Sequence, residues 1–457
     1  MVAMYNAIVL LVTTLAAAAA ADASDITHVR QHDDLHAAVH GALARVRDHD
    51  VELILHGVHH LGNRPLELPG RIAHRLTIRG DDADGGGVSG GVPVTGPWTA
   101  AADSNGNVTL YTAPLPAGVH APDVGCAQAW QGGARLVRAR SPTYQYAAAG
   151  ADGTYLVYKQ GQVAPTYHDF SRVHFVLYES WTASLHRLAA VHPENNTAYF
   201  QTRYNPQWAG QAAGMRYYVE NAREELDEAG EFYCDRVART ITVATAAGAG
   251  APTGVVVPSG LVELVTATGG GDDADAAGGG GGVTFTNVIF EYSAAEMAGC
   301  FAGSCDGQSA AFLTTAAIHL ENAHGYRIEH STLQHLGGYA VWLGPGCVNS
   351  SLASSHVADT GAGGVRVGSN TGNAGVPAAG ANAGCAVTDN VLEDGGHVFQ
   401  EGAGVLAQNG LADLLLSHNE IRYYRPSQFR GTPDCNERLR CTATAWMLTV
   451  AESFAKF

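Results

Sequence analysis

Five segments in the C-terminal half of the chain share one pattern, and this repeat constrains the fold more than any other feature. They are TFTNVIFE (284–291), IEHSTLQH (328–335), LASSHVAD (352–359), VTDNVLED (387–394) and LSHNEIRY (416–423). Each has an apolar residue or Thr first, a small residue or Asn fourth, and an apolar residue sixth. The last three spacings are 24, 35 and 29 residues. Repeats of this length, each too small for its own core, predict a solenoid.

The strands of the solenoid are expected to be short and joined by Gly-rich turns. Second strands recur at AVWLG (340–344), GVRVG (364–368) and GVLAQ (404–408). The chain holds 56 Gly among 457 residues, and each Gly in a helix interior costs about 1 kcal/mol, which disfavours a helical repeat. We therefore predict an all-β protein, a right-handed parallel β-helix whose inward positions stack into apolar ladders.

Other regions are expected to cap or interrupt the solenoid. Residues 33–49 place Leu35, Val39, Ala42, Leu43 and Val46 on one helical stripe, which predicts an N-terminal helix capping the open end. The expected organisation is a signal peptide at 1–23, cap and first coils at 24–124, an inserted β module at 125–265, coils carrying the site at 266–424, and an atypical C-terminal tail at 425–457 with a candidate capping helix.

The N-terminus predicts export. An apolar run from Ala7 to Ala21 ends in small residues, as in a secretory signal peptide; an N-terminal membrane anchor is the alternative. A secreted, extracellular protein without a later membrane span is expected. Sequons at Asn107, Asn195 and Asn349 are candidate glycosylation sites. The candidate disulfides are Cys300 with Cys305 and Cys347 with Cys385.

The net charge of the chain limits which classes of partner it can bind. A formal net charge of -17 disfavours nucleic acid, because phosphate binding needs a basic face. The acidic, Gly-rich stretches 80–87 and 271–282 are interpreted as solvated loops rather than calcium sites. We expect a monomer that needs neither a cofactor nor a metal.

The eighth position of the repeats can carry chemistry. It holds Glu291, His335, Asp359, Asp394 and Tyr423. Equivalent positions of successive coils stack about 4.8 Å apart, so two carboxylates one coil apart would match the roughly 5–5.5 Å separation of retaining glycosidases. Because two like charges this close resist joint ionisation, one acid should stay protonated and donate its proton. We predict Asp359 and Asp394 as the catalytic pair.

Five further side chains are predicted to contact the substrate: His335, Trp342, Arg366, His397 and Glu401. Trp342 and Arg366 should point outward from the second strands, where the indole can stack on a sugar ring and the guanidinium can hold a carboxylate charged. The competing interpretation is structural. Polar residues at a solenoid corner often bond their own backbone, and Trp342 can pack against the inserted module.

Several runs resemble glycoside hydrolase family 141. They are YYVENAREELDEAGEFYCDRVARTITV (217–243), VTFTNVIFEYS (283–293), HVADTGAGGVRVG (356–368) and DNVLEDGGHVF (389–399), with ARLVRARSP (134–142) and ESWTASLHRLAAVHPENNT (179–197) similar to the family's inserted module. The resemblance spans roughly residues 30 to 424. It implies a right-handed β-helix, an aspartate pair carried onto Asp359 and Asp394, and α-L-fucosides or xylan as substrates. After Tyr424 the sequence departs from the family, whose members continue with further coils.

The leading functional hypothesis is a secreted glycoside hydrolase acting on an oligo- or polysaccharide. One aspartate would act as general acid and the other as nucleophile or base. A polysaccharide lyase on the same fold is the first alternative, but the coils are poor in Lys and Arg, which disfavours uronate substrates. A non-catalytic carbohydrate-binding or adhesion protein is the second, since the fold alone permits it.

Overall fold

The structure is a computed structural model of the chain. It describes residues 25–102, 106–120, 126–178, 183–204, 214–269, 281–296, 310, 313–369, 380–408 and 410–424, and the backbone of 439–441. The predicted signal peptide, the Cys300 and Cys305 pair and most of the C-terminal tail lie outside these residues.

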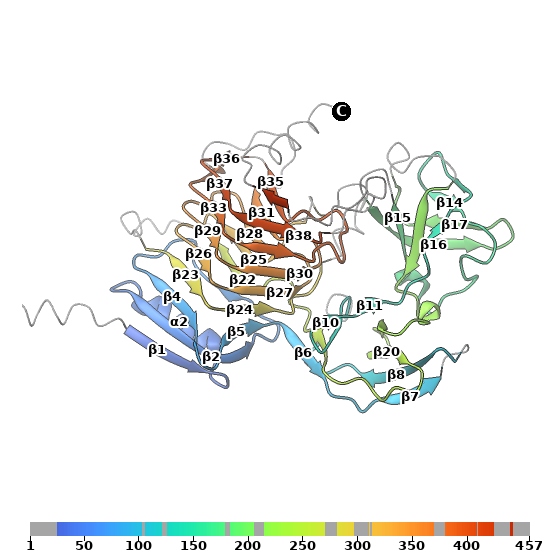
Figure 1. Cartoon of the computed structure of the whole chain (residues 1–457), viewed down its shortest axis with the longest axis horizontal. Coiled ribbons are helices and arrows are strands. Elements are labelled where there is room, and N and C mark those ends of the chain that lie inside the picture. The colour runs from blue at the N-terminus through green and yellow to red at the C-terminus, as the bar shows by residue number, and fades with distance from the viewer. Residues whose placement is uncertain are drawn as a thin grey trace, which may run out of the picture.

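Three stacks of parallel strands form the larger part of the fold (Figure 1). The first contains β2 (Val51–His60), β4 (Leu76–Gly80), β23 (Val283–Thr286), β26 (Arg327–Glu329), β29 (Ser351–Ala353), β33 (Ala386–Thr388) and β37 (Leu415–Ser417). The second contains the end of β2, then β5 (Gly86–Ser89), β24 (Ile289–Glu291), β27 (Thr332–Leu336), β30 (His356–Thr360), β34 (Val391–Glu393) and β38 (Asn419–Arg422), which β39 (Leu439–Cys441) joins in antiparallel fashion. The third contains β3 (Leu66–Glu67), β22 (Val265–Thr268), β25 (Ala316–Glu321), β28 (Tyr339–Leu343), β31 (Val365–Gly368) and β35 (Val405–Gln408). The short strands β32 (Asn382–Ala383) and β36 (Leu411–Ala412) pair beside them.

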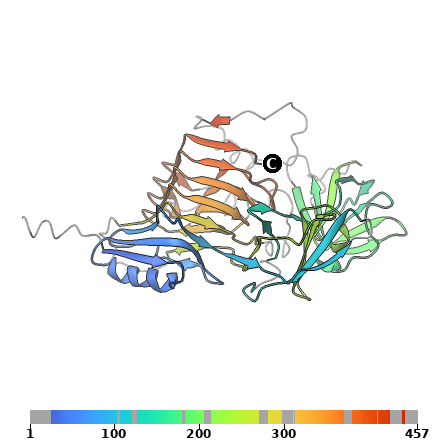
Figure 2. The ribbon, with the colours of Figure 1, turned by 60° about the horizontal axis from the view of Figure 1, so that its bottom comes forward.

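The chain visits the three stacks in a repeating order, so each circuit lies against the one before it (Figure 2). Ile328 pairs with Leu352, Leu352 with Val387 and Val387 with Leu416, which confirms the predicted spacings of 24, 35 and 29 residues. These side chains line one apolar core together with residues of the other two stacks. The predicted register of the first segment is wrong by one residue, because Phe285 rather than Thr284 pairs with Ile328.

The helix α2 (Leu35–Arg45) lies at the N-terminal end of the stacks (Figure 1). Asp34 caps it by accepting a hydrogen bond from the Ala37 amide. Leu35, Val39 and Ala42 are buried in the same core as the stacked strands, as the predicted stripe requires. The strand β1 (Asp25–Arg30) pairs with β2 beside the helix.

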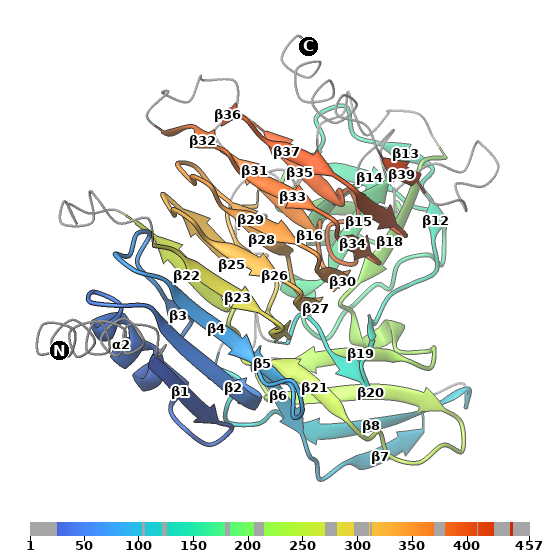
Figure 3. The same ribbon diagram turned by 60° about the vertical axis from the view of Figure 1, so that its left-hand side comes forward.

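The remaining strands form three smaller, mainly antiparallel sheets at one side of the stacks (Figure 3). One contains β10 (Ala134–Arg135), β9 (Trp130–Gln131), β21 (Val255–Pro258) and β6 (Gly91–Val94). Another contains β11 (Val137–Arg138), β19 (Glu231–Asp235), β20 (Thr240–Ala246), β8 (Val108–Pro114) and β7 (Thr99–Ala102). The third contains β12 (Tyr144–Gln145), β18 (Arg216–Glu220), β15 (His174–Tyr178), β16 (Ala183–His192), β17 (Thr197–Phe200), β14 (Tyr155–Val157) and β13 (Ala148–Ala149). Two 3-10 helices, η2 (Phe170–Arg172) and η3 (Arg223–Glu225), lie among them.

The pairing places the start of this region earlier than the sequence does. The sequence predicts an inserted β module beginning at residue 125, whereas β6, β7 and β8 already pair with β20 and β21. The strands of the three smaller sheets therefore run from residue 91 to residue 258.

The predicted disulfide between Cys347 and Cys385 is wrong: both thiols are free and buried. Each sulfur faces a backbone carbonyl instead, Cys347 that of Leu320 and Cys385 that of Cys347. A disulfide that the sequence did not single out joins Cys126 to Cys234, across 108 residues. The three predicted glycosylation sites, Asn107, Asn195 and Asn349, are exposed. Among the described residues, no helix is long and apolar enough to cross a membrane.

Candidate active site

A column of residues lies at the C-terminal ends of β24, β27, β30, β34 and β38 in the second stack, within one residue of the last position of each strand. Its members, called here the corner column, are Tyr292, His335, Asp359, Asp394 and Tyr423, and all have φ between 52° and 58°. The first member is Tyr292 rather than the predicted Glu291, which pairs with Gln334 inside the sheet. In the left-handed region the backbone turns sharply, so these five side chains leave the stack at successive levels.

Asp359 lies at the centre of the corner column and is almost fully bonded. Its Oδ2 accepts hydrogen bonds from Trp130 Nε1 at 2.6 Å and from His335 Nδ1 at 2.7 Å. Its Oδ1 accepts one from Arg135 Nε, and Arg135 Nη2 also donates to the carbonyl oxygens of Asp359 and Leu336 at 2.9 Å. The residue is only 8% exposed.

These partners fix the charge of Asp359. Burial alone would raise the pKa of its carboxyl, but the positive charge of Arg135 lowers it. The hydrogen bonds from His335, Arg135 and Trp130 act in the same direction, and together they hold the pKa well below its ordinary value. Asp359 is therefore an anion at any working pH and cannot be the acid that keeps its proton.

Asp394 stands one coil further along and is half-exposed. His397 connects it to Asp359, with Nε2 3.0 Å from Asp394 Oδ1 and 3.5 Å from Asp359 Oδ1. One carboxylate oxygen of each aspartate and the His397 nitrogen all lie within 4.8 Å of one another. The structure thus brings together the two predicted acids at the distance that the strand spacing implies.

Aromatic rings pack together at the His335 end of the corner column, on the side of Asp359 away from Asp394. The His335 ring stacks on Tyr292, with centroids 5.0 Å apart. The Trp130 indole meets the Tyr292 ring edge-on at 5.2 Å. Because Trp130 is fully buried, it positions the column rather than presenting an open face to a sugar.

Trp130 and Arg135 come from a hairpin that sequence reasoning did not connect with the acids. The strands β9 and β10 pair across Gly132 and Gly133, which have φ of 58° and 81°. A two-residue Gly-Gly loop between short strands is a hairpin signal, and WQGGAR at 130–135 carries it. Nothing in the sequence showed that this hairpin reaches a coil more than 200 residues away.

Trp342 and Arg366 point out of the apolar core as predicted, but they do not line the site. They are 3% and 0% exposed. With His319 they form a stack, called here the aromatic ladder: His319 lies parallel to the Trp342 ring at 4.4 Å, and Arg366 lies over the same ring at 4.8 Å. Trp342 Nε1 donates to the Gly368 carbonyl, and Arg366 donates to Leu313 and Gln408.

The reason is the neighbouring sheet. Val176 of β15, Leu185 of β16 and Tyr218 of β18 pack in one cluster with Trp342, so the ladder is covered. The prediction that Trp342 and Arg366 contact the substrate is therefore wrong, because both side chains are buried against neighbouring residues. Glu401 accepts a hydrogen bond from the Ala310 amide at 2.8 Å, which ties a neighbouring segment to the turn after Asp394.

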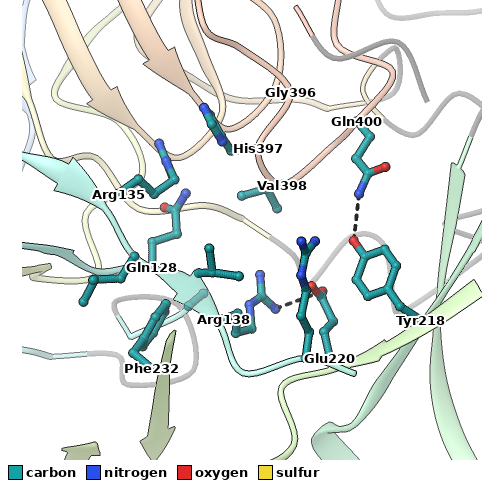
Figure 4. Close-up of a pocket in the computed structure, with 14 residues that line it drawn as sticks. Gln128, Arg135, Arg138, Tyr218, Glu220, Phe232, Gly396, His397, Val398 and Gln400 are labelled. Carbon is teal, nitrogen blue, oxygen red and sulfur yellow. Dashed lines mark hydrogen bonds and ion pairs between the residues drawn. The ribbon is translucent and has the colours of Figure 1, made fainter. Parts of the chain in front are cut away.

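A small cavity of about 130 Å³ opens beside the pair (Figure 4). Its lining includes Arg135 and His397, which both contact Asp359, and continues to Arg138, Arg140, Glu220, Gln128, Tyr218 and Gln400. Most of these residues belong to the antiparallel sheets and the segments that join their strands, whereas His397 and Gln400 follow Asp394. The site is thus a junction between the coils and the region inserted into them.

Two groups of side chains have ligand atoms close enough to hold a metal ion. One is His56 with Asp81 and Asp84, at a surface turn; the other is Asp359 with Asp394 and His397. In the second group the Arg135 guanidinium already occupies Oδ1 of Asp359, which disfavours a cation there.

The fold resembles that of an enzyme of known structure, described as a "Glycoside hydrolase". The two share 18% identity, the match covers 88% of this chain and 78% of that chain, and the TM-score is 0.67. Two structures of the catalytic domain of a GH87 alpha-1,3-glucanase with nigerose align at TM-scores of only 0.13 and 0.12, with 10% and 11% identity over 70% and 72% of this chain and 56% and 63% of theirs. No family model matches the chain, and no curated protein matches it. The first of these likenesses shows that the two proteins share a fold.

Proposed function

We propose that this protein is a glycoside hydrolase whose chemistry is carried by Asp359 and Asp394. The observation that supports it most is the meeting of two carboxylates from adjacent coils, with oxygens within 4.8 Å, beside a cavity. The fold likeness to a glycoside hydrolase points the same way. Two carboxyl groups flanking one bond are the usual requirement for glycoside hydrolysis.

The environments of the two acids assign their roles. Asp359 is held ionised by Arg135, so it suits the stabilisation or attack of the positive charge that develops on the sugar. Asp394 is the half-exposed member, and it is the one that can carry a proton to the leaving oxygen. His397, in contact with both, positions them. The short separation favours retention of anomeric configuration.

We also propose the handedness of the fold, the family and the secretion that the sequence predicts. The repeating circuit of the three stacks supports a right-handed parallel β-helix, because parallel crossovers are right-handed in about 98% of cases. The motif resemblance supports membership of glycoside hydrolase family 141, with a fucoside or a xylan as substrate. The signal-like N-terminus and the exposed Asn107, Asn195 and Asn349 support a secreted glycoprotein.

The test is substitution of each acid by its amide. A screen of aryl glycosides and plant or algal polysaccharides first identifies a hydrolysed substrate. On that substrate Asp359→Asn and Asp394→Asn should each lower kcat by about 10²- to 10⁴-fold, while affinity electrophoresis shows retained glycan binding. Asp389→Asn is the matched control, since Asp389 is another exposed corner aspartate with positive φ on the same coil as Asp394. Wild-type rates in both active-site variants would refute the assignment.

A polysaccharide lyase is the second candidate, because the cavity is richer in arginine than the coils. Arg135, Arg138 and Arg140 all line it, and lyases act on uronates. The products separate the two reactions. A lyase leaves an unsaturated uronide that absorbs in the ultraviolet, whereas a hydrolase leaves a saturated reducing end of defined anomeric configuration, which proton NMR assigns.

A further inference from the structure

The cavity beside the aspartate pair has an excess of positive charge. It is lined by three arginines and one glutamate, Glu220. Arg135 is paired with Asp359, and Arg138 lies 3.4 Å from Glu220. No carboxylate of the described residues lies within ion-pair distance of the Arg140 guanidinium, which sits 5.3 Å from the centre of the Tyr218 ring. The Arg140 side chain is exposed at the rim of the cavity, so its charge faces solvent and can bind an anion without first breaking an ion pair.

Glu220 attracts Arg140 only beyond ion-pair distance, because its carboxylate is paired with other residues. It is buried against Arg138 and His174, at 3.4 and 3.6 Å. Burial alone would raise the pKa of Glu220, but Arg138, His174 and Arg140 lower it to about 2. The carboxylate is thus paired with Arg138 and His174, and Arg140 keeps its guanidinium available to a ligand.

A second, independent feature points into the same space. Gln128 lines the cavity (Figure 4), is only 3% exposed, and neither its Oε1 nor its Nε2 has a hydrogen-bond partner among the described residues. A buried amide with both ends unsatisfied is destabilising, because neither end recovers the hydrogen bond that it made to water in the unfolded chain. This destabilisation is removed when a ligand supplies a donor and an acceptor, as a sugar with hydroxyl groups does.

We propose that this cavity binds an anionic group of the glycan, the carboxylate of a uronic acid or a sulfate ester. The Arg140 guanidinium binds this anionic group directly, and the Gln128 amide forms hydrogen bonds with the neighbouring sugar hydroxyls. Arginine suits this role because its planar fork matches a carboxylate or a sulfate. The inference rests on the proposed function and narrows its substrate class to acidic glycans. It also revises the sequence-based expectation that uronates are disfavoured, since the arginines come from outside the coils.

The test measures binding, not turnover. Affinity electrophoresis compares a glucuronic acid-bearing xylan with its carboxyl-reduced form, and a sulfated fucan with its desulfated form. Wild-type protein should bind one acidic member at least tenfold more tightly than its neutral counterpart, and the responding pair identifies carboxylate or sulfate. Arg140→Gln should lower that affinity about tenfold and abolish the preference. Arg47→Gln, the same charge change at an exposed position after α2, should change nothing.

Each outcome decides one proposal. Equal affinity for acidic and neutral members, or an unchanged Arg140→Gln variant, overturns the anion site. Hydrolysis of a neutral glycan that Asp394→Asn abolishes would then still support the hydrolase. Conversely, an Arg140-dependent acidic preference without any hydrolysis supports the anion site and removes the proposed enzymatic function.

Discussion

The corner column and the aromatic ladder are built alike but differ in their exposure to solvent. Both are columns of polar and aromatic side chains on successive coils, and both point away from the apolar core. The ladder is sealed by the antiparallel sheets, so His319, Trp342 and Arg366 pack. The corner column meets the same region at its edge, where Asp394 stays half-exposed and a cavity opens. The position of a side chain on a coil therefore determines whether it points away from the apolar core. The antiparallel sheets determine whether it is then exposed to a substrate.

The largest expected effect is at the centre of the corner column. Arg135→Met leaves the Asp359 carboxylate buried beside an apolar side chain, and removing one partner of a buried ion pair costs about 3–5 kcal/mol. Urea unfolding should show a loss of this size. The double variant with Asp359→Asn should recover much of it, because the buried charge is then gone. A loss below about 1 kcal/mol in Arg135→Met would show that Asp359 does not depend on this cation.

The aromatic ladder should show its strongest effect in the pH dependence of stability. Burial lowers the pKa of His319, but hydrogen bonds to Glu263 and Glu321 outweigh it and raise the pKa to about 9. Since the unfolded value is near 6.5, the stabilisation is complete below about pH 6.5 and disappears as the pH rises through 9. The free energy of unfolding should fall by roughly 3 kcal/mol over this interval.

The control for this slope is His319→Gln, measured from pH 6 to pH 9.5 beside the wild-type protein. The difference between the two curves isolates the histidine from other groups that titrate in the same range. Curves that run parallel would mean that the pKa of His319 is not raised in the folded protein.

The sequence predicts the coils better than it predicts what surrounds them. The apolar ladder through Ile328, Leu352 and Val387 follows from a period that the letters show, and so does the approach of Asp359 to Asp394. Antiparallel sheets have no such period, so the contact of Trp130 and Arg135 with Asp359 depends on pairing across more than 200 residues. Strand alternation likewise predicts that Trp342 faces outward, but it carries no information about which sheet covers it.

A third test compares Arg366 of the aromatic ladder with Arg135, which binds Asp359 of the corner column. Arg366 donates to a backbone carbonyl and to the Gln408 amide, and burial lowers its pKa, which shows that burial opposes its charge. Arg366→Met loses these bonds but also removes the cost of burying the charge. We expect a loss of about 1–2 kcal/mol in urea unfolding, smaller than that of Arg135→Met, and unchanged hydrolysis. A larger loss of unfolding free energy than in Arg135→Met would mean that the folded state depends more on the buried charge of Arg366 than on that of Arg135.

The smallest effect is expected at Trp342, and it bears directly on which surface meets the glycan. Trp342→Phe removes the hydrogen bond to Gly368 and part of the stacking on His319, at a cost of about 1 kcal/mol. Glycan affinity in affinity electrophoresis should not change, because the ring is covered by the cluster that includes Tyr218. A tenfold loss of affinity, about 1.4 kcal/mol, would mean that the covering sheet moves aside and that the ladder is a sugar-binding surface after all.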